Sequence, residues 1–141
     1  MYIEEKFKIV NTQFENALNG LNNSVLIDTS SFETDLKDTV KSGIIQKFEL
    51  TVELFWKSAK LFIEHNNGIV EKSPKTVVKS LYLLEYINEE IYLGLMDAIN
   101  DRNEISHIYN EENYNIVLGK IPTHIICLNK VFEKMNASNN G

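Results

Sequence analysis

Glycine, proline and cysteine are scarce in this sequence, and their scarcity limits the classes of protein that it can encode. Six glycines and two prolines leave few points at which a helix must stop, and with an apolar fraction of 43% they favour an ordered, mostly helical globule. The single cysteine, Cys127, cannot form a disulfide within the chain and lies in an apolar run, as a small core residue would. A length of 141 residues suits one domain with a substantial core.

Segments that would bring the chain to a membrane, and motifs that bind cofactors, are also missing. No apolar run approaches twenty residues and residues 1–11 are interrupted by Glu and Lys, so we expect a cytoplasmic protein without a membrane span or secretory signal. The sequence has no P-loop, no glycine-rich dinucleotide loop, no zinc-type Cys/His set and no paired aspartates of a nucleotidyltransferase. We therefore expect neither a metal nor a cofactor in this chain.

Arginine is the rarest charged residue. Fourteen residues are basic, and Arg102 is the only arginine among them. The net charge of −6 opposes non-specific binding to nucleic acid or to an acidic membrane, because it repels phosphates at long range. Any contact with RNA must therefore be local or helped by a basic partner. Arginine has a planar guanidinium that can bind two phosphate oxygens at once, and lysine has no such group.

The spacing of apolar residues predicts an all-α protein, an up-and-down bundle of about five helices with a four-helix core. Residues 3–21 place apolar side chains in alternating steps of four and three, which is one stripe of an amphipathic helix. A second helix, expected over 34–65, is apolar on most of its faces. We expect it to be buried on most sides and to form the spine of the bundle.

Capping residues divide the second half of the chain into three further helices. Ser73 and Pro74 are typical of a helix N-terminus, and this third helix is expected to end near residue 86. Asn88 should cap a fourth helix whose apolar stripe continues to residue 109. A fifth runs toward residue 135, with Pro122 expected to kink or divide it. Residues 1–135 then form a single domain, and the polar tail 136–141 is expected to be disordered.

A polar line that includes Glu49, Glu53 and Lys57 crosses the otherwise apolar second helix. Glu53 and Lys57 are four residues apart, so the line can be a solvated seam with an ordinary helix ion pair. It can also supply a carboxylate partner, Glu49 or Glu53, for the lone arginine. The residues alone leave both interpretations open.

The stretch DRNEISHIY at residues 101–109 combines Arg102, His107 and Tyr109 in the pattern R-x4-H-x-Y. Taken singly, each has a structural interpretation: an arginine that bridges helices, a structural histidine, or a core tyrosine. In combination they provide an arginine that can bind phosphate and a histidine that exchanges protons near neutral pH. Five residues at about 100° each place His107 about 140° around the helix from Arg102, so the two do not share a face. We therefore expect the site to be completed between two copies related by a two-fold axis.

Three segments carry a resemblance to a known family: GIIQKFELTVELFWKSAK at residues 43–60, SPKTVV at 73–78 and DRNEISHIY at 101–109. They resemble the HEPN-domain proteins encoded beside minimal nucleotidyltransferases, the nucleotidyltransferase substrate-binding or HepT-like family. The resemblance covers almost the whole chain. It implies a HEPN-like helical bundle, a homodimer, and assembly with the partner nucleotidyltransferase.

Family members with R-x4-H-x-Y resemble metal-independent endoribonuclease toxins whose tyrosine accepts AMP from the antitoxin partner. The resemblance thus implies that Arg102 and His107 are catalytic and that Tyr109 is the AMP acceptor, and we expect Asn103 to orient the histidine or a phosphate. RNA carries its own nucleophile, the 2′-hydroxyl, so its cleavage requires no metal. The alternative is a non-catalytic subunit that presents a substrate to the transferase.

Overall fold

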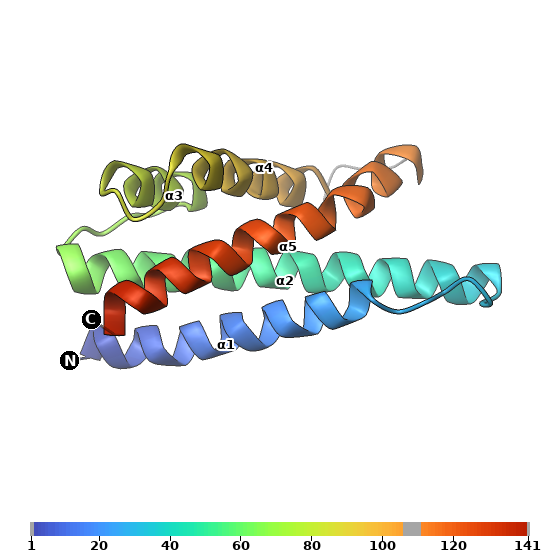
Figure 1. Ribbon diagram of the computed structural model, residues 1–141, viewed down its shortest axis with the longest axis horizontal. Helices are drawn as coiled ribbons and strands as arrows, with labels where there is room; N and C mark the ends of the chain where they lie inside the picture. The colour runs from blue at the N-terminus through green and yellow to red at the C-terminus, as the bar shows by residue number, and fades with distance from the viewer. Residues whose placement is uncertain (1, 106–110, 141) are drawn as a thin grey trace.

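The computed structural model describes residues 2–105 and 111–140, which form five helices (Figure 1). The helices are α1 (Tyr2–Val25), α2 (Thr34–Asn67), α3 (Pro74–Leu83), α4 (Glu89–Ile105) and α5 (Glu111–Asn140). No strand occurs in these two ranges, which confirms the all-α bundle of about five helices predicted from the sequence. Within the same ranges no helix is long and apolar enough to cross a membrane.

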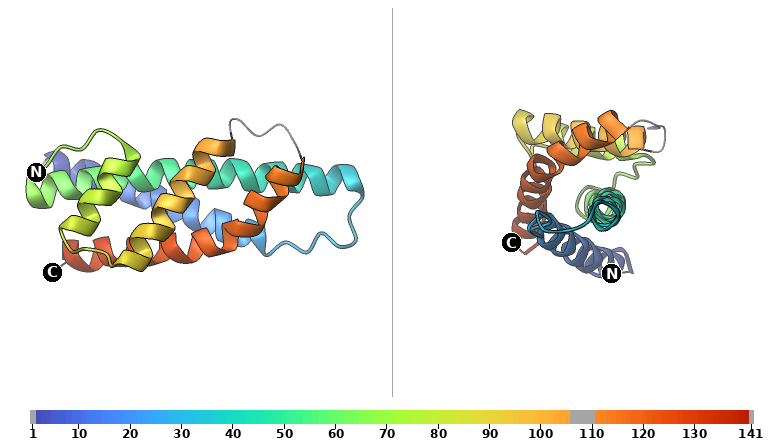
Figure 2. Two further views of the ribbon diagram at one scale, coloured as in Figure 1. Left: turned by 90° about the horizontal axis from the view of Figure 1, so that it is seen from above. Right: turned by 90° about the vertical axis from the view of Figure 1, so that its right-hand side faces the viewer.

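Helix α2 organises the bundle. It is the longest helix, with 34 residues, and it packs against each of the other four. Figure 2 shows α1, α2 and α5 running along the length of the molecule, with α3 and α4 covering one side. Both chain termini lie at the same end (Figure 1). The neighbours leave one side of α2 uncovered, where Leu50 is 54% exposed, so the helix is buried on fewer sides than its apolar sequence suggests.

The core is built on aromatic residues of α2. Phe48 and Phe55 are fully buried, and the neighbouring Trp56 is half-buried against the core. The Phe14 ring of α1 tilts against Phe55 with centroids 5.8 Å apart and meets Phe132 of α5 edge-on at 5.7 Å. These contacts join three helices through one aromatic cluster.

Helix ends follow the capping signals in the sequence where those signals are local. Ser73 accepts a hydrogen bond from the Thr76 backbone N–H at 3.4 Å and Pro74 opens α3, as predicted. Asn88 Oδ1 accepts from the Ile91 N–H at 2.9 Å and caps α4. Helix α3 ends earlier than expected, at Leu83. The reason is that Glu85 adopts a φ of 65°, which terminates the helix.

Helix α5 is continuous through Pro122 rather than divided. Figure 2 shows the helix bending between its orange and red parts, as expected where a proline removes one backbone hydrogen bond. The helix also continues to Asn140, beyond the boundary that the sequence places at 135. Asn136 donates to the Phe132 carbonyl at 2.7 Å and accepts from Asn11 of α1 at 2.8 Å. These bonds extend the helix into the tail that was expected to be disordered.

Helices α4 and α5 approach closely at Gly94. A Cβ at this position would lie 2.7 Å from the Sγ of Cys127, a buried thiol that donates to the Ile91 carbonyl at 3.4 Å. Such overpacking typically costs about 1–3 kcal/mol, against a gain in helix propensity of about 1 kcal/mol. We therefore expect Gly94→Ala to lower the free energy of unfolding by about 1 kcal/mol, as measured by urea denaturation.

Gly43→Ala is the matched control for this substitution. Gly43 also lies inside a helix, but nothing lies within 4 Å of an added Cβ. It should raise the free energy of unfolding by about 0.5–1 kcal/mol. If both alanines stabilise the protein equally, α4 and α5 are not packed as described.

Candidate functional site

Arg102 lies in the last turn of α4 and points toward α2. Its Nη2 lies 3.6 Å from Oε2 of Glu53, and its side chain is 37% exposed. The Nε atom is buried and has no hydrogen-bond partner among residues 2–105 and 111–140. One long ion pair does not use the bonding capacity of a guanidinium, which has five N–H donors. Among residues 2–105 and 111–140, the partly exposed head group therefore keeps N–H donors that can bind an anion.

Glu53, the partner of Arg102, belongs to a small network of polar contacts on α2. Its Oε2 also accepts a hydrogen bond from Trp56 Nε1 at 3.0 Å, and its Oε1 lies 3.3 Å from Lys57 Nζ. Burial opposes the charged form of Glu53, but the Trp56 hydrogen bond and the two cations outweigh it and lower the pKa of the carboxyl group. The carboxylate is thus charged at neutral pH.

The structure answers the question that the polar line of α2 left open. The ordinary helix pair of Glu53 with Lys57 and the pairing of Glu53 with Arg102 are both present. Of the two candidate partners, Glu53 forms the ion pair, whereas Glu49, one turn earlier, forms none with Arg102 in the part of the chain that the structure describes.

The other residues of the R-x4-H-x-Y pattern are not described. His107 and Tyr109 fall within 106–110 and lie outside the described residues. Asn103 is exposed on α4, one position after Arg102. The roles of Arg102, Asn103, His107 and Tyr109 in a reaction therefore stay predictions, and the contact that can be described is the ion pair of Arg102 with Glu53.

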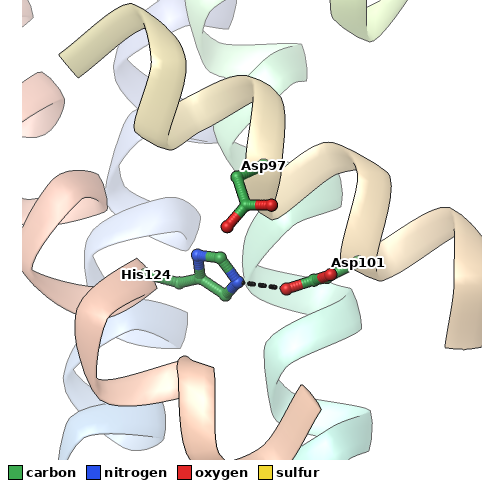
Figure 3. Close-up of side chains that lie close together, drawn as sticks. All are labelled: Asp97, Asp101 and His124. Atoms are coloured by element: carbon green, nitrogen blue, oxygen red, sulfur yellow. Dashed lines mark hydrogen bonds and ion pairs between the residues drawn. The ribbon is translucent and has the colours of Figure 1, made fainter. Parts of the chain in front are cut away.

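A second polar cluster, which the sequence did not reveal, joins α4 to α5 (Figure 3). His124 Nε2 lies 2.6 Å from Oδ2 of Asp101, and both residues are buried. The His124 ring stacks on Phe48 of α2, with centroids 5.4 Å apart and an angle of 20° between the planes. Asp101 directly precedes Arg102. The turn of α4 that carries the lone arginine is therefore bonded to α5.

Lys120 completes this cluster. Its Nζ lies 2.9 Å from Asp101 Oδ2 and 3.0 Å from Asp97 Oδ2. Burial opposes the charged form of Lys120, but its hydrogen bonds and ion pairs with Asp101 and Asp97 outweigh it and raise the pKa of the ammonium group. Ligand atoms of Asp97, Asp101 and His124 lie within 4.8 Å of one another, close enough to share a metal ion. The Lys120 ammonium already bonds to both carboxylates, so we assign no metal here.

The pairing of His124 with Asp101 could not be seen in the sequence, because the two residues are 23 positions apart on different helices. A signal was nevertheless present. Asp97 and Asp101 are four residues apart on α4, and Lys120 and His124 are four residues apart on α5. Residues at this spacing share a helix face, so two complementary pairs were available to face each other once α4 and α5 packed side by side.

One family of known proteins matches most of this chain. The model of the family described as "Nucleotidyltransferase substrate binding protein like" matches residues 11–137. A search of the curated proteins finds no match.

Several solved structures have the same fold. A protein from Thermus thermophilus is 23% identical, with a TM-score of 0.76, 86% of this chain covered and 98% of that one. A tri-AMPylated HEPN toxin from Shewanella oneidensis in complex with MNT antitoxin is 17% identical, with a TM-score of 0.75 and coverage of 93% and 96%. A mutant MntA–HpeT toxin–antitoxin is 14% identical, with a TM-score of 0.77 and coverage of 93% and 97%. These likenesses show the HEPN fold.

Proposed function

This chain belongs to the nucleotidyltransferase substrate binding protein like family, and on that premise we propose that it is the toxin of a toxin–antitoxin pair, a metal-independent endoribonuclease. A partner nucleotidyltransferase encoded alongside acts as the antitoxin and adenylylates Tyr109, and the pair works in the cytoplasm. The observation that carries the proposal is the position of Arg102. The only arginine of an acidic chain is partly exposed at the end of α4, and its ion pair with Glu53 is long, at 3.6 Å.

The proposed reaction uses the nucleophile that RNA contains. The 2′-oxygen attacks the adjacent phosphorus while His107 accepts the hydroxyl proton. His107 then returns a proton to the 5′-oxygen as the P–O bond to it breaks. Arg102 binds the phosphate oxygens, on which negative charge increases in the transition state. Glu53 contacts the guanidinium at 3.6 Å, and a phosphate can replace this weak contact.

Adenylylation of Tyr109 provides the control. It attaches a bulky anion two residues from His107, and this group obstructs RNA both sterically and by repulsion between like charges. Two of the structures that share this fold are described as a toxin with an antitoxin, one of them as tri-AMPylated. These descriptions support the proposal that a partner antitoxin adenylylates this chain.

The decisive test is the cleavage of a mixed RNA pool by the chain freed of partner and AMP. We expect the parent to cleave in the presence of EDTA, and His107→Ala to lower the rate by about 100-fold or more, the usual effect of losing a general acid–base group. Tyr109→Phe should no longer accept AMP from the partner. A parent that leaves RNA intact would contradict the proposal and favour the non-catalytic substrate-binding subunit.

We also propose a homodimer whose interface includes the end of α4. The helical spacing expected from the sequence puts Arg102 and His107 on different faces, and two copies related by a two-fold axis would bring one copy's arginine to the other's histidine. Light scattering at micromolar concentration should give twice the mass of the 16.3 kDa chain. A monomer mass would overturn this part of the proposal.

A further inference from the structure

We infer that Asp101, bonded to His124 and Lys120, is a positioning residue for Arg102: it fixes the last turn of α4 on α5 so that the guanidinium is correctly aimed at phosphate. This role rests on the proposed ribonuclease function. It adds Asp101, His124 and Lys120 to the residues that serve the reaction, although none of them touches RNA.

The last described turn of α4 is held from two sides. Consecutive residues of a helix project about 100° apart. Asp101 accordingly contacts His124 and Lys120 on α5, while Arg102 contacts Glu53 on α2. A rotation of this turn that moved the guanidinium would have to break the bonds of Asp101.

The two attachments of this turn differ in strength. The Arg102–Glu53 contact is 3.6 Å long, and both side chains are about a third exposed. Exposed pairs of this kind contribute about 0–1 kcal/mol, too little to hold an arginine in one place. The Asp101 bonds are shorter, at 2.6 and 2.9 Å, and the Asp101 side chain is only 12% exposed. Charge-assisted bonds of this length in a buried setting are the stronger attachment.

Because the Asp101 attachment consists of hydrogen bonds and ion pairs, it also restricts the orientation of α4. Well-packed apolar residues usually stabilise a helix contact as well as a buried ion pair does, without the cost of desolvating charges. Hydrogen bonds add direction, because a carboxylate that bonds a ring N–H and an ammonium accepts few orientations. Phe48 stacked on the His124 ring fixes the donor in turn. The cluster is therefore suited to hold one orientation of α4.

The experiment compares four variants with the parent in RNA cleavage and thermal unfolding. Asp101→Asn removes the negative charge and one of the two acceptor oxygens, and His124→Leu removes the bond between the ring and Asp101. His124→Gln keeps an amide N–H that can donate to Asp101. Ser58→Ala is the control, because it removes a buried bond of 3.1 Å to Asn11 that joins α2 to α1 and involves no residue of α4. We expect the first two to lower kcat by about 10- to 100-fold, as misplacing a catalytic group does, with KM within about twofold. His124→Gln should restore most of kcat.

The outcomes separate this inference from the function on which it rests. If the parent cleaves RNA and Asp101→Asn and His124→Leu keep its kcat, the inference is overturned and the proposed function stands. If Ser58→Ala lowers kcat as much as they do, lost stability explains the effect and the inference is again overturned. If the parent does not cleave, both fall together. Should Asp101→Asn fail to fold, the contrast between His124→Leu and His124→Gln decides.

Discussion

Arg102→Lys is expected to remove most RNA cleavage, by about two orders of magnitude, although it keeps the positive charge. An ammonium group is a compact point charge and cannot form the paired, planar contacts that a guanidinium makes with phosphate oxygens. Stability should change little, because the side chain is 37% exposed and its ion pair with Glu53 is long, at 3.6 Å. Activity and melting temperature should therefore respond differently to this single substitution.

Both quantities are to be measured on the same preparations, with His107→Ala as the inactive reference. Lys57→Gln is a matched control, since it removes the other cation beside Glu53, at 3.3 Å, without altering α4. We expect it to leave cleavage within about threefold of the parent, because the Lys57 side chain is half exposed and its pair with Glu53 is an ordinary surface ion pair. If Arg102→Lys cleaves as well as the parent but melts earlier, the arginine only bridges α4 and α2.

The sequence predicted those parts of the fold that depend on neighbours along the chain. Ser73 and Asn88 cap helices through bonds to residues three positions on, and Gly68 ends α2 with a positive φ of 68°. Such signals act within one turn and can be read without a structure. The apolar faces of α2 likewise identified it as the helix on which the others pack.

Contacts between distant parts of the chain account for most of what the sequence did not reveal. Helix α5 extends past residue 135 partly because Asn136 bonds to Asn11, which is 125 positions away. Glu49 and Glu53 lie one turn apart on the same polar line, and only the axial placement of α4 along α2 selects Glu53 for Arg102. The choice between two equivalent carboxylates is made by tertiary packing.

The same limit applies to the site. The pattern R-x4-H-x-Y drew attention to Arg102 but not to Asp101, which directly precedes it. An acidic residue near a helix end is usually solvated, and here it is buried against His124 and Lys120 of a helix that follows in the chain. The function of a residue in such a cluster depends on the packing of α4 against α5, which periodicity alone does not define.

Phe48→Ala should have the largest effect on stability. Phe48 is fully buried on α2, and its ring stacks on the His124 imidazole at 5.4 Å. Truncation leaves a cavity and exposes the bond between His124 and Asp101 to water. Phenylalanine-to-alanine changes in cores typically cost about 3–5 kcal/mol, a large part of the roughly 5–15 kcal/mol by which domains are stable. Urea denaturation at a fixed protein concentration measures the loss.

Two further variants identify the source of this loss. Ile9→Ala on α1 removes an apolar side chain that is 61% exposed, so it should change the free energy of unfolding by no more than about 0.5 kcal/mol. Phe48→Leu keeps most of the apolar volume but removes the ring that stacks on His124, and we expect a loss of about 1–2 kcal/mol. If Phe48→Ala costs as little as Ile9→Ala, α2 does not pack on α5 as described. Phe48 would then not fix the His124 ring that bonds to Asp101. Helix α4 would in turn lack the fixed contact with α5 that orients Arg102.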